Sequence, residues 1–200
     1  MFTESVKPYA PSCDENKKVI LEAIKPYLEK KSTVLEIASG TGQHAAYFAQ
    51  NMSHLKWQTS DLKAAKVGIS MWLKEADLPN LLYPIELNVS ESEWPQQKFD
   101  AIFTANSLHI MSQKNVKDMF FKLTQVLDKN GLLIVYGPFN YGGQYTSQSN
   151  AQFDVWLKNQ NRLSCIKDFE WCNELAEQAQ LHLLKDIEMP CNNRVLIWQR

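Results

Sequence analysis

Apolar positions follow two spacings along the 200-residue chain, one typical of buried strands and one typical of amphipathic helices. Short apolar runs bounded by turn residues predict strands at 33–38, 55–60, 82–87, 99–105 and 132–136. Apolar residues three or four positions apart predict helices from Ser12 or Asp14 to about Tyr27, and at 45–51, 62–76, 114–127, 151–159 and 168–180.

Several boundaries rest on single residues. Pro26 is expected to end or kink the first helix, because proline removes a backbone donor. Val67 and Leu73 are expected on the buried side of their helix. Asn130-Gly131 is predicted to stop the helix that ends at Leu127. The segment 137–150 is expected to form a long loop.

The chain closes with a predicted hairpin of strands at 182–189 and 195–199, joined by the turn 190–193. Strand–helix alternation implies right-handed βαβ units. We therefore predict an α/β fold: a Rossmann-like doubly wound sheet, mostly parallel, with a C-terminal antiparallel hairpin. Residues 1–200 form one domain in this interpretation, and residues 1–16 are a candidate N-terminal lid.

A ligand is expected where the parallel strands end, since their carboxyl ends share one edge of the sheet. If the strand at 182–189 runs parallel to the others, the hairpin turn overhangs this edge. Asn192 and Asn193 then either contact substrate or supply the positive φ that a tight turn requires.

Composition excludes some functions. The 21 basic and 22 acidic residues give a net charge of −1, which argues against nucleic-acid binding. No apolar run reaches the roughly 18 residues that span a bilayer, and the N-terminus lacks the apolar core of a secretory signal. We expect a cytoplasmic protein without a membrane segment. The four cysteines fit no common zinc pattern, so no metal site is expected.

The stretch 34–44, VLEIASGTGQH, places a glycine turn between a predicted strand and a helix. Turns of this kind let a backbone approach a ligand closely. A P-loop would need a lysine directly after its second glycine, and none occurs before Lys56. Triphosphate hydrolysis is therefore excluded.

A dinucleotide turn is harder to exclude. Gly40, Gly42 and Ala45 meet the pattern G-x-G-x-x-G/A, and Asp61 follows at a suitable distance. Glu36, however, lies just before the turn, where a carboxylate would repel a pyrophosphate but suits a cationic ligand.

Glu36-Ile-Ala-Ser-Gly40-Thr-Gly42 resembles the first motif of class I S-adenosylmethionine-dependent methyltransferases, E/D-x-G-x-G-x-G. Ala38 replaces the first glycine, which adds only a methyl group. Asp61-Leu62 matches the acid that binds the ribose and the residue that covers adenine. Asp61 can also cap the following helix. Asn88-Val89 stands where many members carry an acid near the adenine amino group.

Two further sets of segments extend the resemblance. Thr104-Ala-Asn106-Ser-Leu-His109 resembles the A-N-x-L-H segment of small-molecule methyltransferases. YAPSCDENK, GPFNYGGQYTSQSNAQFD, DFEW and MPCNN resemble a subgroup called methyltransferase-like 26, whose substrate the resemblance leaves open. The resemblance implies S-adenosylmethionine as cofactor and S-adenosylhomocysteine as product, with contacts from Glu36, Ala38, Ser39, Gly40, Gly42, Asp61, Leu62, Asn88, Val89 and Asn106.

Two residues are candidate general bases. His109 titrates near neutral pH, although a lone histidine can also be purely structural. Tyr141 belongs to a group of aromatic residues that form either a packed loop or the walls of a substrate pocket: Tyr136, Phe139, Tyr141 and Tyr145.

The sequence therefore favours a methyltransferase that acts on a small molecule, not on nucleic acid. Two alternatives stay open at this point. One is an NAD(P)-linked oxidoreductase built on the same type of turn, and the other is a non-catalytic module that binds S-adenosylmethionine.

Overall fold

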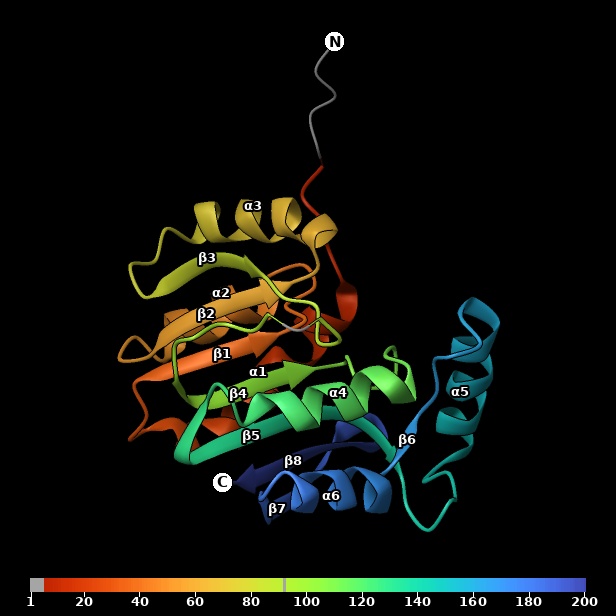
Figure 1. The fold of residues 1–200 in the computed structure, drawn as a ribbon. Helices are drawn as coiled ribbons and strands as arrows, with labels where there is room; N and C mark the ends of the chain where they lie inside the picture. Colours follow the sequence, from red (N-terminus) through yellow and green to blue (C-terminus); the bar gives the residue numbers. More distant parts are fainter. Residues whose placement is uncertain (1–5, 92) are drawn as a thin grey trace. The chain divides into compact units, whose positions relative to one another are not determined.

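The computed structural model describes residues 6–91 and 93–200, and it has the mixed α/β, Rossmann-like fold that the sequence predicts (Figure 1). The chain divides into two compact units, Met1–Asn88 and Val89–Arg200. Strands in both units are mostly parallel, and an antiparallel pair closes the chain.

The first unit contains three parallel strands in the order β3-β2-β1. The strands are β1 (Thr33–Ile37), β2 (Lys56–Asp61) and β3 (Leu81–Glu86). Its helices are α1 (Pro11–Leu28), α2 (Gln43–Asn51) and α3 (Lys66–Ala76), with a short 3-10 turn, η1 (Lys63–Ala65), before α3. The glycine turn joins β1 to α2.

Two expectations about these helices are corrected. Pro26 does not end α1, which continues to Leu28. Val67 is 62% exposed, and Ile69 takes the buried position beside Leu73. The helical spacing was right, but the apolar stripe runs through Ile69 and Leu73, four residues apart on one face.

In the second unit, the described residues 89–91 and 93–200 form five strands. They are β4 (Phe99–Ala105), β5 (Leu127–Asn140), β6 (Lys167–Asp168), β7 (His182–Met189) and β8 (Asn193–Gln199). Four of them follow the order β4-β5-β8-β7, and β6 pairs with β5. The helices are α4 (Gln113–Leu123), α5 (Gln148–Gln160) and α6 (Phe169–Gln178). A 3-10 turn, η2 (Pro190–Asn192), joins β7 to β8.

The boundary between α4 and β5 differs from the sequence prediction. The helix ends at Leu123, and Leu127 already pairs with Phe99 of β4. The register then shifts before Ala101, so the extra residues of β5 form a bulge around Asn130, whose φ is 62°. Asn130-Gly131 therefore bends a strand instead of ending a helix.

The predicted loop at 137–150 is shorter than expected. Residues 137–140 continue β5, and α5 already begins at Gln148. In Figure 1, α5 stands past the carboxyl end of β5, whereas α4 and α6 lie along the strands of this unit.

The closing hairpin agrees with the sequence prediction. β7 and β5 each pair with β8 in antiparallel register, so β7 runs in the same direction as β5. The turn after β7 therefore lies at the same edge as the carboxyl end of β5. Within the described residues, no helix is both long and apolar enough to cross a membrane.

Candidate active site

The glycine turn leaves β1 through three residues with positive φ: Ala38 at 57°, Gly40 at 61° and Gly42 at 91°. A Cβ atom on Gly40 would meet no described atom within 4 Å, so the backbone there faces open space. A Cβ on Gly42 would lie 3.3 Å from Ile69. Gly40 thus fits a close approach by a ligand, and Gly42 fits close packing of α2 against α3.

Ala38 corrects an expectation from the sequence. Its methyl group is more than a small addition, because φ near +57° brings Cβ close to the following carbonyl oxygen. That conformation costs roughly 1–2 kcal/mol for a residue other than glycine. The turn thus holds an alanine in a left-handed conformation that glycine would adopt without this steric cost.

Asp61 ends β2 and binds the glycine turn directly. Its Oδ2 accepts a hydrogen bond from the Gly40 amide at 2.8 Å, and its Oδ1 accepts one from the Leu62 amide at 2.7 Å. Burial raises the pKa of Asp61, and these two amides act in the opposite direction. The side chain does not cap a helix, because Leu62 is the N-cap of η1 and has no side-chain capping bond. Each carboxylate oxygen keeps a lone pair for a hydroxyl donor.

Glu36 is buried beneath the turn, with 1% of its surface exposed. The Trp57 indole Nε1 donates a hydrogen bond to its Oε2 at 3.1 Å. Desolvation raises the pKa of Glu36 to about 7, and the nearby Asp61 charge acts in the same direction. The glycine turn therefore lies beside two acidic side chains, of which Glu36 is charged only above about pH 7. A charged acid at this position favours a cation over a phosphate.

Ser39 joins the turn to the neighbouring strand. It is buried, and its backbone amide donates to the Ser60 carbonyl at 2.9 Å while its Oγ accepts from the Ser60 amide at 3.1 Å. The Ser60 hydroxyl in turn donates to the Glu36 carbonyl at 2.6 Å. These bonds fix the turn against β2.

The remaining cofactor candidates follow the strands. Leu62 is 53% exposed directly after Asp61, as a residue that covers a planar ring would be. Asn88 is partly exposed and ends the first unit. In the second unit, Val89 is buried, and Asn106 follows β4 with φ at 54° and donates its amide to the Tyr136 carbonyl at 2.9 Å.

His109 is buried in the second unit. Its ring meets the Phe153 ring edge-on at 5.2 Å, and a Cβ on Gly137 would lie 3.7 Å from its Nδ1. Desolvation, and to a lesser extent the charge of Lys167, lowers the pKa of His109 to about 4. The imidazole is neutral near pH 7 and can accept a proton, although as a weak base.

The hydroxyl group of Tyr141 acts as a hydrogen-bond donor. Its hydroxyl donates to Asp186 Oδ2 at 2.8 Å, and its ring stacks on Phe169 at 5.1 Å. Burial and the Asp186 hydrogen bond raise its pKa above the ordinary value, which opposes a role as a base. Tyr136 and Phe139 are buried core residues. Within the aromatic group, Tyr136 and Phe139 thus pack in the core, whereas Tyr141 forms part of a pocket wall.

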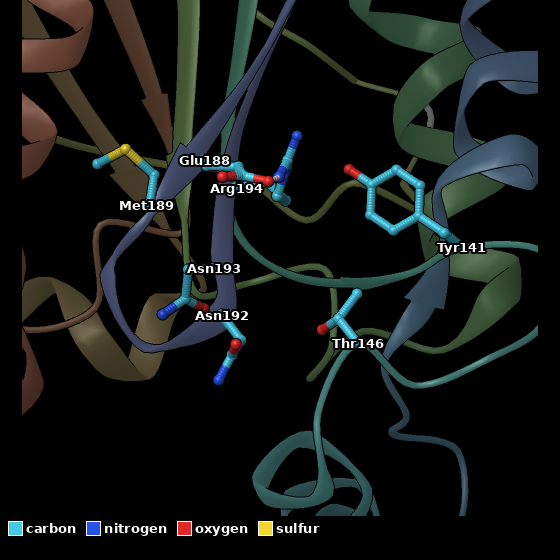
Figure 2. Close-up of a pocket in the computed structure, with 7 residues that line it drawn as sticks. All are labelled: Tyr141, Thr146, Glu188, Met189, Asn192, Asn193 and Arg194. Atoms are coloured by element: carbon cyan, nitrogen blue, oxygen red, sulfur yellow. Dashed lines mark ion pairs between the residues drawn. The ribbon is translucent and has the colours of Figure 1, made fainter.

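A pocket of about 490 Å³ lies at the carboxyl ends of β5 and β7 (Figure 2). Figure 2 shows Tyr141 and Thr146 on one side and the hairpin turn with Asn192 and Asn193 on the other. Cys191 and Asn192 have φ of 59° and 56°. Asn192 therefore both supplies the positive φ and lines a pocket. The full lining is Tyr141, Thr146, Glu188, Met189, Asn192, Asn193 and Arg194.

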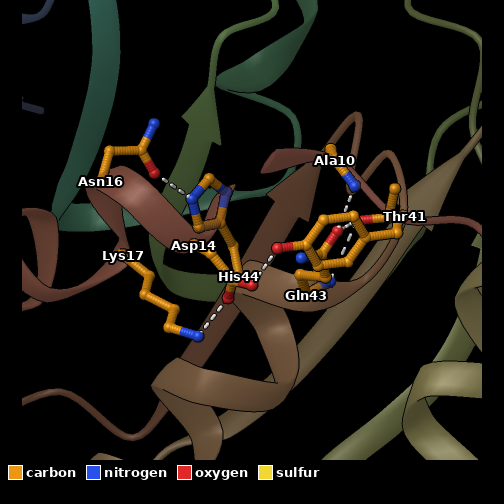
Figure 3. Close-up of polar contacts among 8 residues, drawn as sticks. Ala10, Asp14, Asn16, Lys17, Thr41, Gln43 and His44 are labelled. Carbon is orange, nitrogen blue, oxygen red and sulfur yellow. Dashed lines mark hydrogen bonds and ion pairs between the residues drawn. The ribbon is translucent and has the colours of Figure 1, made fainter. Parts of the chain in front are cut away.

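The N-terminal segment binds the start of α2 (Figure 3). The Ala10 amide donates to Gln43 Oε1 at 2.7 Å, and the Thr41 hydroxyl donates to the same atom at 2.9 Å. His44 Nε2 lies 2.6 Å from Asn16 Oδ1. Residues 1–5 of the candidate lid lie outside the described residues.

Gln43 and His44 were not selected from the sequence as site residues. Both are buried, and desolvation lowers the pKa of His44 to about 4. The only signal in the sequence is their position immediately after the glycine turn. Among residues 6–91 and 93–200, no group of three or more His, Cys, Asp or Glu could hold a metal ion.

Residues 7–200 match a protein family described as "Protein of unknown function (DUF938)". The chain belongs to this family. The DUF938 chain is also 32% identical over 124 residues to the polyketide synthase PksR of Bacillus subtilis (strain 168). That match covers 57% of the DUF938 chain and 5% of PksR.

Several solved structures with the same fold are methyltransferases. The S-adenosylmethionine-dependent methyltransferase SibL has a TM-score of 0.80, at 18% identity over 94% of the DUF938 chain. Human N-acetylserotonin methyltransferase, in complex with SAM, has a TM-score of 0.79 at 10% identity over 94% of the chain. The DUF938 chain spans 55% and 52% of their lengths. At these identities, the likeness establishes the class I methyltransferase fold.

Proposed function

We propose that this protein is an S-adenosylmethionine-dependent methyltransferase that acts on a small molecule. One observation carries the proposal: the glycine turn is bound by Asp61 and lies above the buried Glu36. A dinucleotide turn must receive a pyrophosphate, which the carboxylate of Asp61, and that of Glu36 above about pH 7, would repel. A ligand with a ribose, a sulfonium and an ammonium suits both acids.

The residues of the turn fit such a cofactor. The open space at Gly40 leaves room for its backbone approach, and Asp61 offers lone pairs to the ribose hydroxyls. The exposed Leu62 would cover one face of the adenine. From the family resemblance, the remaining proposed contacts are Ala38, Ser39, Gly42, Asn88, Val89 and Asn106.

When bound, S-adenosylmethionine would supply a methyl group already activated by its sulfonium. The glycine turn and Asp61 would hold this donor, which would supply its methyl carbon to the acceptor's lone pair, with sulfur keeping the electron pair of the broken bond. The protein's work is then alignment and exclusion of water. An acceptor that carries a proton must also release it, and we propose the neutral imidazole of His109 for that step. Tyr141 is better placed as a pocket wall than as a base.

Further parts of the proposal rest on sequence resemblance. The segments YAPSCDENK and MPCNN support membership of the methyltransferase-like 26 subgroup. The segment 6–16, bound to α2 through Gln43, is proposed to close over the cofactor. We also propose a cytoplasmic location and no nucleic-acid partner, since the net charge is −1.

Calorimetry with S-adenosylmethionine, S-adenosylhomocysteine and NADH tests the cofactor. We expect both adenosyl ligands to bind and NADH not to bind. Binding of NADH alone would refute the proposal and favour the oxidoreductase. Turnover is tested by incubating the protein with metabolite extract and S-adenosylmethionine labelled in its methyl group. Tight cofactor binding with no labelled product in any extract would favour a non-catalytic module.

A further inference from the structure

We propose that the pocket between Tyr141 and the hairpin turn receives the methyl acceptor and selects an acceptor that carries a positively charged, hydrogen-bond-donating group. This inference rests on the proposed methyltransferase function and names its substrate class. It concerns the second unit alone, where all of the lining residues lie.

The position of the pocket follows from strand direction. β5 and β7 run the same way, so Tyr141 and Met189 both mark carboxyl ends at one edge. Ligands of Rossmann-like folds bind at this edge. A volume of about 490 Å³ lies within the range of small-molecule sites.

The charges of the pocket wall do not cancel. Arg194 Nε donates to Asp186 Oδ1 at 2.7 Å, and the Tyr141 hydroxyl occupies Oδ2. Arg194 and Asp186 therefore neutralise each other. Glu188 remains: its Oε1 lies 3.0 Å from Arg194 Nη1, but 89% of its side chain is exposed. Asp186 does not itself line the pocket, but it contacts Tyr141 and Arg194, which do; counted with it, two carboxylates and one guanidinium leave one net negative charge.

The neighbouring charges add to this balance. The carboxylate of Glu170 accepts the Gly142 amide at 3.0 Å, directly beside Tyr141. Lys185 is exposed and is not one of the residues that line the pocket. The excess of carboxylates would repel an anionic acceptor and weaken its binding. A cationic acceptor would form an ion pair with Glu188.

The polar groups of the turn are arranged as acceptors. Asn192 donates its Nδ2 to Ser149 Oγ at 3.5 Å, and Asn193 donates its Nδ2 to the Pro190 carbonyl at 3.3 Å. Their Oδ1 atoms are left as acceptors, and a ligand with N–H or O–H donors would satisfy them. Met189 is the only aliphatic residue of the described lining, and Tyr141 is its aromatic residue.

Backbone strain supports a functional role for the turn. Cys191 and Asn192 both have positive φ, without a glycine at either position. Such conformations are strained for residues other than glycine and concentrate at ligand sites. Here they hold Asn192 and Asn193 along the pocket.

Three probes of similar length and different charge test the selection without any methyl transfer: putrescine, 1,4-butanediol and succinate. NMR would follow the side-chain amide signals of Asn192 and Asn193 at pH 7.5 and low salt. We expect putrescine to bind at least tenfold more tightly than succinate. Glu188→Gln should remove most of that difference, whereas the matched control Glu174→Gln on α6 should keep it. Equal or tighter binding of succinate would overturn the inference.

A labelling experiment separates this inference from the proposed function. Extracts would be divided by ion exchange and incubated with S-adenosylmethionine labelled in its methyl group. We expect labelled product in the fraction retained by a cation exchanger, with KM raised about tenfold by Glu188→Gln and kcat unchanged. Label only in the anionic or neutral fraction would overturn the inference and leave the methyltransferase proposal standing. Failure of S-adenosylmethionine to bind would instead overturn the proposed function, and the probe titrations would still decide the charge preference of the pocket.

Discussion

Glu36 and Asp61 are two carboxylates at one glycine turn, and their surroundings give them different tasks. Asp61 is held by two backbone amides and keeps lone pairs for hydroxyl donors. Glu36 is fully buried, with the Trp57 indole as its donor. At the residue scale, the two acids therefore differ in solvent exposure: Asp61 is partly exposed, and Glu36 is buried.

Replacing Asp61 tests the ribose contact. Asp61→Asn should weaken S-adenosylmethionine binding by roughly 1–3 kcal/mol, the usual range for a hydrogen bond to a charged group. Calorimetry measures the affinity, and urea unfolding separates this loss from a loosened glycine turn. Asp128→Asn, an acid of the second unit, is the matched control. Unchanged affinity in Asp61→Asn would remove Asp61 from the cofactor site.

Glu36 should make stability depend on pH. The folded protein keeps the Glu36 proton up to about pH 7, whereas the unfolded chain releases it near the ordinary pKa of 4.5. The folded state binds more protons between these values, so this group's contribution to stability falls as pH rises from about 4.5 to 7. The difference is on the order of 3 kcal/mol.

Urea unfolding of the wild type and Glu36→Gln at pH 5 and pH 7.5 measures this contribution. The comparison isolates Glu36, because His44 and His109 titrate in both proteins. We expect the wild type to lose stability relative to Glu36→Gln as pH rises. Glu22→Gln, an exposed acid on α1, should follow the wild type. A constant difference between wild type and Glu36→Gln would show that Glu36 is ionised throughout.

At the scale of elements, the connections between strands and helices form the site. The turn from β1 to α2 uses three positive φ angles, and the turn from β7 to β8 uses two. Their residues would be strained in isolation, so the packing of the flanking strands must hold them. The segment before α1 adds a third connection through Gln43.

Ala38→Gly should stabilise the protein, by up to about 1 kcal/mol, because glycine removes the steric cost at φ 57°. Greater freedom of the unfolded chain offsets part of the gain. Ala46→Gly, within α2, should instead destabilise by about 1 kcal/mol. Chemical unfolding at one pH measures both. Destabilisation by both substitutions would contradict the assigned backbone geometry of Ala38.

Gln43→Ala should release the N-terminal segment. Because Ala10 loses its acceptor, we expect faster chymotrypsin cleavage after Tyr9, which is 58% exposed. If the segment closes over the cofactor, S-adenosylmethionine should slow this cleavage in the wild type and less so in the variant. Gln50→Ala, an exposed residue of the same helix, should behave as wild type. Cleavage unaffected by cofactor in the wild type would exclude a closing role.

At the scale of the whole molecule, the fold is that of methyltransferases, and the family is one of unknown function. The match to the family spans residues 7–200, and SibL shares the fold over 94% of the chain. Rossmann-like folds carry out many different reactions, so the fold alone does not identify the function. The fold favours a methyltransferase only when it is combined with the two acids, Glu36 and Asp61, at the glycine turn.

Cofactor binding should stabilise the entire chain. A hundredfold excess of S-adenosylmethionine over its Kd should raise the free energy of unfolding by about 2.7 kcal/mol, through binding to the folded state alone. Urea unfolding with and without ligand measures this shift. NADH at equal concentration serves as the control and should leave stability unchanged. Stabilisation by NADH in place of S-adenosylmethionine would reverse the choice of cofactor.

The sequence by itself determined the order of strands and helices apart from the short strand β6, and it determined the glycine turn and the closing hairpin. Apolar spacing reports which face of a segment is buried, and glycine pairs report where the backbone needs positive φ. The sequence placed the end of α4 too late, because β5 begins within a run of residues that also suits a helix. It also predicted Val67 to be buried, whereas α3 packs through the face that carries Ile69.

Only the tertiary structure decided which polar groups meet. The contacts of Asn16 with His44 and of Tyr141 with Asp186 join residues 28 and 45 positions apart. No local pattern encodes such pairs, since each depends on how separate elements pack. The same holds for the raised pKa of Glu36 and for the charge of the hairpin pocket. Burial and mutual distance set both quantities, and these exist only in the folded chain.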